Sequence, residues 1–505
     1  MPMLTELHAK DIRGVLSCFD RMLIMGTLPD IAHAKAFTRE LNRRGVRIFD
    51  FPRFAQELRD RIRDHAERLA TEHGLPIEFI KKIKAFRKEE RVQEILAERG
   101  THPGLVHIFS AMESCSSFKP WHDKPSGKTF LLPDSGRCLH YYFYFIDPEL
   151  GLCHLRVPTW APFRLQFCMN GHNWLASRLE EGGIAFKQVD NAFVDIEDFE
   201  AAQQMADSFH PQVLHRKLEG FVERFCPVAS EFAAGYHWSL MQLEYATDLV
   251  FRSRKALQPL YEHLVRMAVH AVRAEQVATF LGKKLDPRYL GEVGNDFNTR
   301  IQGTRIRHQM GRVALKMYDK LGHVLRIETV VNDVSFFKYH RTVEHRDGTR
   351  DKKLAPVKKT LYSLGVMAEL LGAANRRYLE FLSSLDDDSE GRRKLEKLSG
   401  RVRDANRSYR GINFFDGEDL ALLFALVRGE FNIRGFQVRD LRGILTEFTG
   451  PQLSRHLRRL RVHRLVKKVQ GTYRYYLTRL GRRVIAAALR LREGSLIPAL
   501  AGLPA

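Results

Sequence analysis

The sequence predicts an α+β protein, in which a large body is followed by a small basic C-terminal domain. At 505 residues the chain is too long for one hydrophobic core. Strand-like and helix-like segments alternate through residues 1–382, and several of the strands are joined as hairpins. An acidic and then a basic run at 383–400 precedes a stretch rich in Leu and Arg. We therefore expect a mixed sheet with hairpins and long helices, a charged linker at 383–410 and a separate domain at 411–505.

The N-terminal α/β region, residues 1–235, has clear segments. A helix is expected at 54–74, where apolar residues recur every three or four positions. A second long helix is expected through 163–183. Alternating or continuous apolar runs predict strands and one hairpin, at 14–27, 46–51, 104–113 and 138–158.

The central α+β region, residues 236–382, continues the mixture. HWSLMQLEYATDLVF (237–251) predicts a strand and SRKALQPLYEHLVRMAVHAV (253–272) predicts a helix. KMYDKLGHVLRIE (316–328) predicts two strands joined at a tight turn that contains Leu321 and Gly322.

The overall charge limits the class of partner. Lys and Arg number 81 against 60 Asp and Glu, which gives a net charge of +21. A field of this sign attracts polyanions, and nucleic acid is the commonest polyanion inside cells. The start of the chain lacks the apolar core of a secretory signal, and no apolar run is long enough for a membrane span. We therefore expect a cytoplasmic protein that binds DNA and no membrane.

Cofactor signals are few. The six cysteines are scattered without a C-x-x-C pair, which predicts reduced thiols rather than a zinc site or a disulfide framework. His140, His154 and His172 lack the spacing of metal ligands and are expected to be structural. No G-x-x-x-x-G-K-[ST] loop occurs. Neither a nucleotide nor a redox cofactor is indicated.

The sequence of the C-terminal domain predicts a clear order of helices and strands. Two helices are followed by a helix start at 449–452, where a threonine cap, a proline and a glutamine occur in sequence. The helix that follows places Leu453, Leu457 and Leu460 on one apolar face. A hairpin turning at Gln470 and Gly471 and a final helix complete the domain. Between Pro451 and Arg490 there are twelve Lys or Arg and no Asp or Glu.

This order resembles the winged-helix DNA-binding domains of the MarR-like kind. The resemblance implies that the helix enters the major groove of duplex DNA and that the hairpin, the wing, contacts the backbone or the minor groove. A winged helix used only for protein contacts is the alternative, and the apolar segment 484–491 is suited to forming a homodimer. The residues expected to contact DNA are Gln452, Ser454, Arg455, Arg458 and Arg459 on the helix, and Lys467, Lys468 and Arg474 on the wing.

Carboxylates in the central region suggest a metal site. Strand alternation places Gln242, Glu244 and Asp248 on one face, and the 316–328 hairpin adds Asp319 and Glu328. Carboxylate oxygens suit Mg²⁺ or Mn²⁺, which could activate a nucleophile against a phosphodiester. Tyr318 lies beside Asp319, and a tyrosine nucleophile would form a covalent phosphotyrosine. The candidate metal ligands are Glu244, Asp248, Asp319 and Glu328, and the candidate catalytic residues are Tyr318, Asp319 and Glu328.

The order EYATD, GTR, KMYDK and LRIE resembles the rolling-circle replication initiators of plasmids and phages. The resemblance covers 236–333 and implies that Glu244 or Asp248, together with Asp319 and Glu328, are metal ligands. The sequence departs from that family because it has no His-hydrophobic-His motif of the metal-binding kind.

Two registers of the 316–328 hairpin have different consequences. A two-residue loop at Leu321 and Gly322 places Asp319, Arg326 and Glu328 on one face and leaves Tyr318 in the core. A loop one residue longer places Tyr318 beside Arg326 and Glu328. Two-residue loops are the commonest hairpin connections, so the first register is the expected one.

Two further features could serve nucleic acid. Segment 116–137 is rich in Gly, Pro and Ser and is expected to be a loop. It could contact a single strand through Lys119, Trp121, Lys124 and Lys128, act as a mobile lid, or be a plain surface loop. Asp20 lies on a candidate buried strand, where it could be the first metal ligand of an RNase H-type nuclease, a cap or an ion-pair partner.

Together these observations predict a bacterial DNA-binding protein of the mobile-element type, similar to replication initiators or transposition proteins. In it, the winged helix recognises duplex DNA and the body engages or nicks one strand. A non-catalytic winged-helix transcription regulator, whose body binds a ligand or a partner, is the alternative. A structural DNA-binding or RNA-processing factor is a third interpretation.

Overall fold

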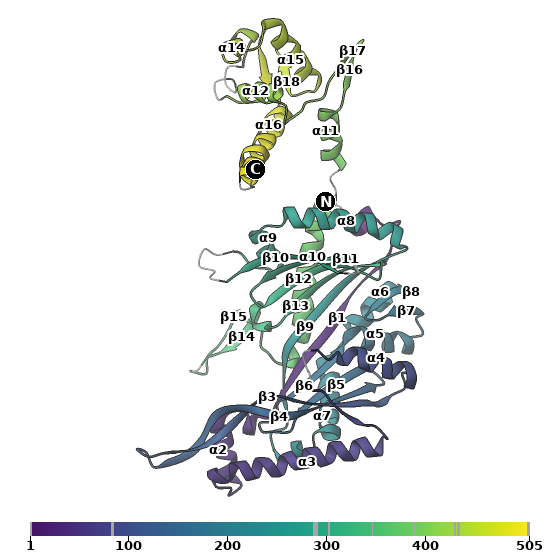
Figure 1. Cartoon of the computed structure of the whole chain (residues 1–505), viewed down its shortest axis with the longest axis vertical. Coiled ribbons are helices and arrows are strands. Elements are labelled where there is room, and N and C mark those ends of the chain that lie inside the picture. Colours follow the sequence, from purple (N-terminus) through teal and green to yellow (C-terminus); the bar gives the residue numbers. More distant parts are fainter. Residues whose placement is uncertain are drawn as a thin grey trace. The chain divides into compact units, whose positions relative to one another are not determined.

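The computed structural model describes residues 3–501 except 82–84, 286–290, 301–302, 346, 387–388, 429–430 and 432–434. The chain forms two compact units, Met1–Asp386 and Asp387–Ala505, which are described separately (Figure 1). The prediction of a mixed α+β protein with a large mixed sheet is confirmed. None of the described helices is long and apolar enough to cross a bilayer.

The body is built on one sheet, whose eleven strands in the described residues have the order β10-β11-β12-β13-β9-β1-β6-β5-β4-β3-β2. β2 is parallel to β3, and the other neighbours are antiparallel. The strands are β1 (Ile12–Thr27), β2 (Ile77–Phe79), β3 (Gly104–Asp123), β4 (Lys128–Asp147), β5 (Gly151–Pro158), β6 (Leu165–Asn170), β9 (His237–Phe251), β10 (Val293–Arg300), β11 (Gly303–Met310), β12 (Val313–Lys320) and β13 (Val324–Val331).

The regions 1–235 and 236–382 do not form separate domains. β9 pairs with β1 on one side and with β13 on the other, so the sheet continues across the expected boundary at residue 235. The break between the two units falls at Asp386, inside the segment 383–410 that was expected to be a linker.

Helices cover the sheet on both faces. They are α1 (Leu4–Leu7), α2 (Ala34–Arg43), α3 (Phe51–Glu72), α4 (Lys88–Arg99), α5 (Gly171–Glu181), α6 (Phe199–Asp207), α7 (Pro211–Phe225), α8 (Arg254–Ala271), α9 (Ala274–Phe280) and α10 (Leu364–Asp386). Two small hairpins accompany them, β7 (Phe186–Val189) with β8 (Ala192–Ile196) and β14 (Lys338–Glu344) with β15 (Arg350–Pro356).

The two faces of β9 have different surroundings. One face packs on α10, where the Asn375 amide donates to the Tyr245 carbonyl at 3.0 Å and to Thr247 Oγ1 at 3.1 Å. Because strand residues alternate between faces, Glu244 and Asp248 lie on the opposite face. Residues 245–251 of β9 are all buried, so both faces of the strand are covered there. The polar face of β9 therefore lies inside the body rather than in bulk solvent.

Three predicted elements differ from the structure. Segment 46–51 is not a strand, because Ile48–Asp50 is a short 3₁₀ helix that leads into α3. The helix expected at 163–183 begins only at Gly171, since 165–170 forms β6 and the Asn170 side chain caps α5. Segment 116–137 is not a loop: β3 and β4 remain paired as far as Asp123 and Lys128, and Phe118 is anchored on the Phe37 ring.

The β12–β13 hairpin has the longer loop, so the expected two-residue register is wrong. Tyr318 is paired with Arg326 and Asp319 with Leu325, which leaves residues 321–323 in the loop. Leu321 and Gly322 have φ values of 63° and 74°, in the left-handed region. The Asp319 carboxylate accepts a hydrogen bond from the Gly322 N–H at 2.9 Å and so stabilises this turn. Asp319 therefore faces away from Tyr318.

The C-terminal unit consists of helices and short hairpins around its own core. The elements are α11 (Ser389–Ser399), β16 (Val402–Asp404), β17 (Arg407–Tyr409), α12 (Gly417–Leu426), α14 (Val438–Arg442), α15 (Gly450–Val462), β18 (Val466–Lys468), β19 (Tyr475–Leu477), α16 (Arg479–Leu491) and α17 (Ile497–Ala501). Leu453, Leu457 and Leu460 of α15 are buried in this core, as their spacing predicts. Phe436 adds a bridge to Tyr475 at the edge of the β18–β19 hairpin.

Arg459 does not lie on the outer surface of α15. Its side chain is 7% exposed and forms an ion pair with Asp419 of α12. Asp419 also accepts a hydrogen bond from the Asn413 N–H at 2.9 Å. The expectation that Arg459 contacts DNA is therefore wrong, because its charge is used inside the unit.

This ion pair gives a test of the C-terminal unit. Asp419→Ala leaves the buried Arg459 charge unpaired and should lower the free energy of unfolding of this unit by about 3 kcal/mol. Arg458→Ala, the control, removes the exposed arginine next to it and should change stability by less than about 0.5 kcal/mol. Urea unfolding followed by tyrosine fluorescence measures both, and equal effects of the two variants would contradict the buried pair.

Candidate active site

A buried arginine lies at the centre of the polar face of the sheet. Arg326 of β13 is fully buried, and its Nε and Nη2 donate to the two carboxylate oxygens of Asp248 at 2.7 and 2.6 Å. Nη1 donates to Asp20 Oδ2 at 3.1 Å, and Nη2 also contacts the Asn191 carbonyl at 2.6 Å and His172 Nε2 at 3.0 Å. One guanidinium thus joins β1, β9, β13, α5 and the β7–β8 turn.

Contacts with Arg326 also help to lower the pKa values of the two aspartates. Burial by itself would raise the pKa of Asp248, but the charge and hydrogen bonds of Arg326 outweigh burial and lower the pKa. The pKa of Asp20 is likewise held well below its usual value, because contacts with His172, Arg326 and Asn191 outweigh burial. Both aspartates are therefore ionised at neutral pH.

Three carboxylates from different strands meet beside Arg326. Asp20, Glu244 and Glu328 each place one oxygen so that the three oxygens lie within 4.8 Å of one another. Asp20 and Glu328 are buried and Glu244 is half-buried. Hard oxygen donors at this spacing fit a divalent cation such as Mg²⁺ or Mn²⁺. We call Asp20, Glu244 and Glu328 the acid cluster.

A β-bulge brings Asp20 into the acid cluster. Phe19 is paired with Tyr245 and Met22 with Leu243, so two residues of β1, Asp20 and Arg21, lie opposite Glu244 alone. A bulge of this kind redirects side chains, and bulges are common beside active sites. Asp20, Arg21 and Glu244 consequently line the same cavity.

Two further groups of β12 touch the acid cluster. The Lys316 ammonium lies 2.5 Å from Glu328 Oε2 and 3.9 Å from Glu244 Oε1. The Tyr318 hydroxyl donates to Glu328 Oε1 at 3.3 Å. Burial, and then repulsion from Glu328, raise the pKa of Glu244 to about 7. Glu244 is therefore the member of the cluster whose protonation changes near neutral pH.

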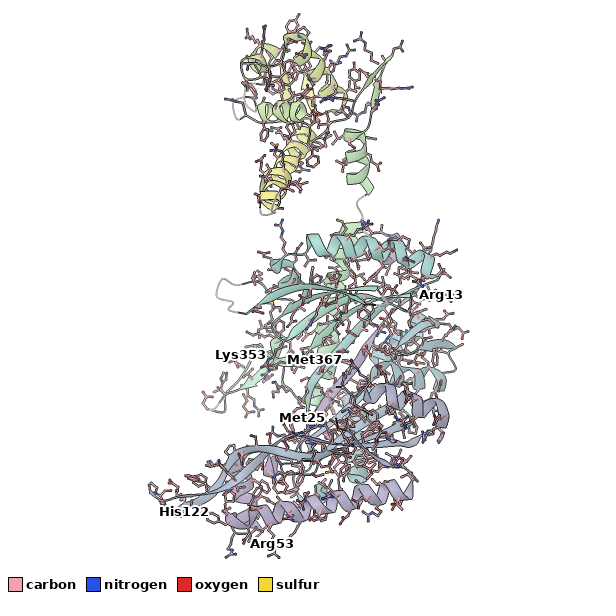
Figure 2. The ribbon with its side chains drawn as sticks, in the orientation of Figure 1. Arg13, Met25, Arg53, His122, Lys353 and Met367 are labelled. Carbon is pink, nitrogen blue, oxygen red and sulfur yellow. The ribbon has the colours of Figure 1, made fainter. Side chains whose placement is uncertain are left out.

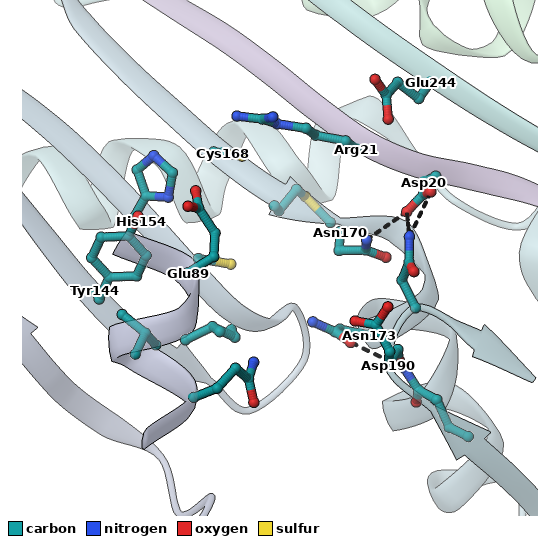
Figure 3. Close-up of a pocket in the computed structure, with 17 residues that line it drawn as sticks. Asp20, Arg21, Glu89, Tyr144, His154, Cys168, Asn170, Asn173, Asp190 and Glu244 are labelled. Carbon is teal, nitrogen blue, oxygen red and sulfur yellow. Dashed lines mark hydrogen bonds between the residues drawn. The ribbon is translucent and has the colours of Figure 1, made fainter. Parts of the chain in front are cut away.

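The acid cluster opens into a cavity of about 810 Å³. Figure 3 shows Asp20 and Glu244 at one end of it and Tyr144, His154 and Glu89 at the other. Strands β9, β1, β6, β5 and β4 contribute residues to this cavity, together with α4, α5, β7 and the β7–β8 turn. A ligand in the cavity can reach the carboxylates of Asp20 and Glu244, whereas Glu328 is buried and does not line the cavity.

The structure brings together only part of the predicted site. Glu244 and Glu328 lie in the acid cluster, and Tyr318 shares their face. Asp248 lies on the same face, but both of its oxygens are bound by Arg326. Asp319 lies on the other face of β12 and binds its own turn. The prediction that Asp248 and Asp319 are metal ligands is therefore wrong, because neither carboxylate is available to the cluster. The prediction that Asp319 is catalytic is wrong for the same reason.

Asp20 takes one of the roles that were considered for it, that of an ion-pair partner. It is an ion-pair partner of Arg326 and also a member of the acid cluster. The sequence shows an acid on a buried strand, but the bulge and the pairing with β9 decide its position. His172, expected to be structural, contacts Arg326, whereas His154 lines the cavity.

Most of the remaining predicted residues lie on exposed surfaces, and Gln452 and Arg474 are half-buried. Trp121 is 49% exposed near the tip of the β3–β4 hairpin, where Figure 2 labels the neighbouring His122. Lys119, Lys124 and Lys128 are exposed in the same region. In the C-terminal unit Gln452 accepts from the Thr449 N–H at 2.7 Å as a helix cap, and Arg474 is half-buried. The exposed members of the predicted set are Ser454, Arg455, Arg458, Lys467 and Lys468.

Comparison of the chain with protein-family models, with curated proteins and with solved structures finds no match.

The burial of Glu244 and its repulsion from Glu328 should affect the stability of the body. The pKa of Glu244 is raised from 4.5 to about 7, so the stability linked to its proton is present below the unfolded value and lost as the pH rises through 7. Glu244→Gln removes this loss and should raise the melting temperature by about 2–4 °C near pH 8 without divalent metal.

The gain from Glu244→Gln should shrink near pH 5.5, where the wild-type carboxyl keeps its proton. Differential scanning fluorimetry across this pH range provides the measurement. Glu369→Gln, at an exposed position of α10, is the control and should have no effect at either pH. A lower melting temperature for Glu244→Gln near pH 8 would show that the ionised Glu244 carboxylate is not destabilised by its surroundings.

Proposed function

We propose that this chain is a DNA-binding protein of the mobile-element type, similar to replication initiators or transposition proteins. Its C-terminal unit recognises duplex DNA, and its body nicks or transfers one strand with the help of Mg²⁺ or Mn²⁺. The observation that carries the catalytic part is the acid cluster, three carboxylates within 4.8 Å of one another, two of which, Asp20 and Glu244, line an open cavity. Carboxylates gathered in this way are costly unless a cation compensates them.

The chemistry follows from the groups around the cluster. When bound by Asp20, Glu244 and Glu328, a divalent cation supplies electrostatic stabilisation for the charge that develops on a phosphate. Burial, and then the charge of Glu328, raise the pKa of Tyr318 well above its usual value. Tyr318 therefore needs a base, and Glu328, which already accepts its hydrogen bond, is positioned to take the proton. The Tyr318 oxygen would then bond to phosphorus as the bond from phosphorus to one sugar oxygen of the strand breaks, and that oxygen would leave with the proton held by Glu328.

Several features of the C-terminal unit support a winged helix. Its helices are followed by the β18–β19 hairpin and a closing helix, and Phe436 adds a bridge to the hairpin. The leucines of α15 face the core, which leaves Ser454, Arg455 and Arg458 exposed. Lys467 and Lys468 are exposed on the hairpin. An exposed basic helix beside a basic hairpin fits the major groove and the flanking phosphates of duplex DNA.

The β3–β4 hairpin provides a second surface for nucleic acid. Trp121 offers an aromatic face on which a base can stack, and Lys119, Lys124 and Lys128 are exposed near it. Stacking combined with lysines that follow the backbone is how proteins hold single strands without sequence preference. We propose that this hairpin holds the strand on which the body acts.

We also propose a homodimer, but one that forms through a different surface from the predicted segment 484–491. Within the predicted segment 484–491, Val484 and Leu489 pack against the core of the unit. Leu491, Ile497 and Leu500 are 52%, 41% and 66% exposed on the last helices. Exposed apolar side chains of this kind are suited to pairing with a second copy of the chain.

A non-catalytic transcription regulator is the second candidate, and Lys316 favours it. An ammonium 2.5 Å from Glu328 already compensates part of the charge of the acid cluster. In this case the cavity would bind a ligand that regulates DNA binding, and no strand would be cut.

Cleavage assays separate the two candidates. Purified protein incubated with supercoiled or single-stranded DNA and Mn²⁺ should nick the DNA, and Glu328→Gln should lower the rate by about a hundredfold or more. Asp319→Asn is the matched control: it keeps an oxygen for the Gly322 N–H on the opposite face and should retain activity. Tyr318→Phe should abolish any covalent protein–DNA adduct seen on denaturing gels. Absence of cleavage with every substrate and metal would exclude the catalytic proposal.

Salt dependence tests the duplex-binding surface. Each lost phosphate contact reduces the slope of log K against log salt by about one unit. The double variant of Arg455→Ala and Arg458→Ala should therefore bind duplex DNA more weakly, with a slope smaller by about two units in fluorescence anisotropy. Arg53→Ala, which removes an exposed arginine of α3 in the body, should leave the slope unchanged. An unchanged slope in the double variant would show that α15 is not the DNA-binding helix.

A further inference from the structure

The end of the cavity remote from the acid cluster has its own chemical character. Tyr144 of β4 and His154 of β5 lie there, with Glu89 of α4 beside them (Figure 3). Arg21 and Cys168 line the stretch between these residues and the acid cluster. A ligand that occupies the whole cavity must therefore satisfy carboxylates at one end and this second group at the other.

Tyr144 is the residue whose hydrogen bonding indicates that a ligand binds here. It is only 3% exposed, yet its hydroxyl has no hydrogen-bond partner among the described residues. Tyr142, two positions earlier on the same strand, contrasts with it, because its hydroxyl donates to Glu113. A buried hydroxyl without a partner costs free energy, and such groups in native proteins are usually explained by function. The Tyr144 side chain lines the cavity, so a ligand there can supply the missing partner.

The other groups at this end define the kind of ligand. The rings of Tyr144 and His154 are 4.7 Å apart and tilted by 31°. Burial, and then the nearby cations, lower the pKa of His154 to about 3, so the imidazole is neutral at physiological pH. A neutral ring and a phenol favour a planar, uncharged ligand with hydrogen-bonding edges over a phosphate or a carboxylate. Glu89 adds an acceptor, which fits an amino group on that ligand.

Arg21 connects this end to the acid cluster. It follows Asp20 in the β1 bulge, and its side chain is exposed. A guanidinium is the side chain best suited to bind a phosphate. The cavity of about 810 Å³ lies within the range of sites that enclose small ligands, about 300–1,000 Å³.

We propose that this end of the cavity binds one unpaired nucleobase that carries an exocyclic amino group, with Arg21 on the phosphate that leads to the acid cluster. The base belongs to a DNA strand in which it is not paired, since the edge that Tyr144 and Glu89 would contact is otherwise occupied by its complement. This inference deepens the proposed function and rests on it for the identity of the ligand. A free nucleotide would present the same chemistry.

Binding of single strands tests the inference in the full-length protein. Fluorescence anisotropy with labelled oligo(dC), oligo(dA) and oligo(dT) in Ca²⁺ should show tighter binding of the two amino-bearing bases. Tyr144→Phe should weaken the binding of oligo(dC) by about five- to tenfold. Because the lost hydroxyl has no protein partner, the melting temperature should stay the same or rise. Glu89→Gln should reduce the preference for oligo(dC) over oligo(dT).

Tyr142→Phe is the matched control. It removes a hydroxyl that already has a partner in Glu113 and that does not line the cavity, so it should lower the melting temperature and leave the affinity unchanged. Competition with dCMP distinguishes the two sources of the base: displacement by dCMP alone at similar affinity would assign the site to a free nucleotide.

The outcomes separate this inference from the proposed function. If Tyr144→Phe binds all three oligonucleotides like the wild type, the base site is excluded, whereas loss of cleavage in Glu328→Gln would still support the nicking activity. If Tyr144→Phe weakens binding but no DNA is cut under any condition, the base site stands and the catalytic proposal fails.

Discussion

The fold of the site depends on the buried guanidinium of Arg326. An unpaired charge in this position would cost several kcal/mol, so it requires partners with good geometry. Asp248 provides two hydrogen bonds, Asp20 provides a third, and the Asn191 carbonyl provides a fourth. These partners come from β9, β1 and the β7–β8 turn, segments far apart in the sequence. The same set of contacts that compensates one charge thus brings three parts of the chain to one point.

The acid cluster is a consequence of this arrangement. His172 and Arg326 together hold Asp20 in its ionised form, and Asp20 in turn lies close to Glu244 and Glu328. Lys316 pairs with Glu328 and lies farther from Glu244, so it only partly offsets the burial of Glu244 and its repulsion from Glu328, and the pKa of Glu244 is raised to about 7. A proton on Glu244 therefore relieves the cluster when no cation is bound. In the proposed function, a divalent cation would have to displace that proton, so the affinity of the site for the cation should increase as the pH rises through 7.

Sequence patterns identify the strands of this site but not its register. Alternation along 237–251 places Glu244 and Asp248 on one face, as found. The hairpin at 316–328 is also found, but the Asp319 bond to the turn stabilises a longer loop, and a slip of one residue moves every side chain to the other face. For this reason Tyr318, rather than Asp319, lies on the face that carries the carboxylates. The position of Asp20 depends on a bulge against β9, a partner more than 200 residues away, which no local pattern contains.

The two units would recognise nucleic acid by different physical means. The C-terminal unit presents charges on an open surface, and such contacts weaken steeply as salt rises because bound counterions are released. The far end of the cavity presents a phenol, a neutral imidazole and a carboxylate, and hydrogen bonds of this kind respond little to salt. In the proposed function, ionic strength therefore controls how tightly duplex DNA is held, whereas the identity of the unpaired base controls which nucleotide reaches the acid cluster. Selection of the site and selection of the nucleotide would then be separable, because each depends on groups in a different unit of the chain.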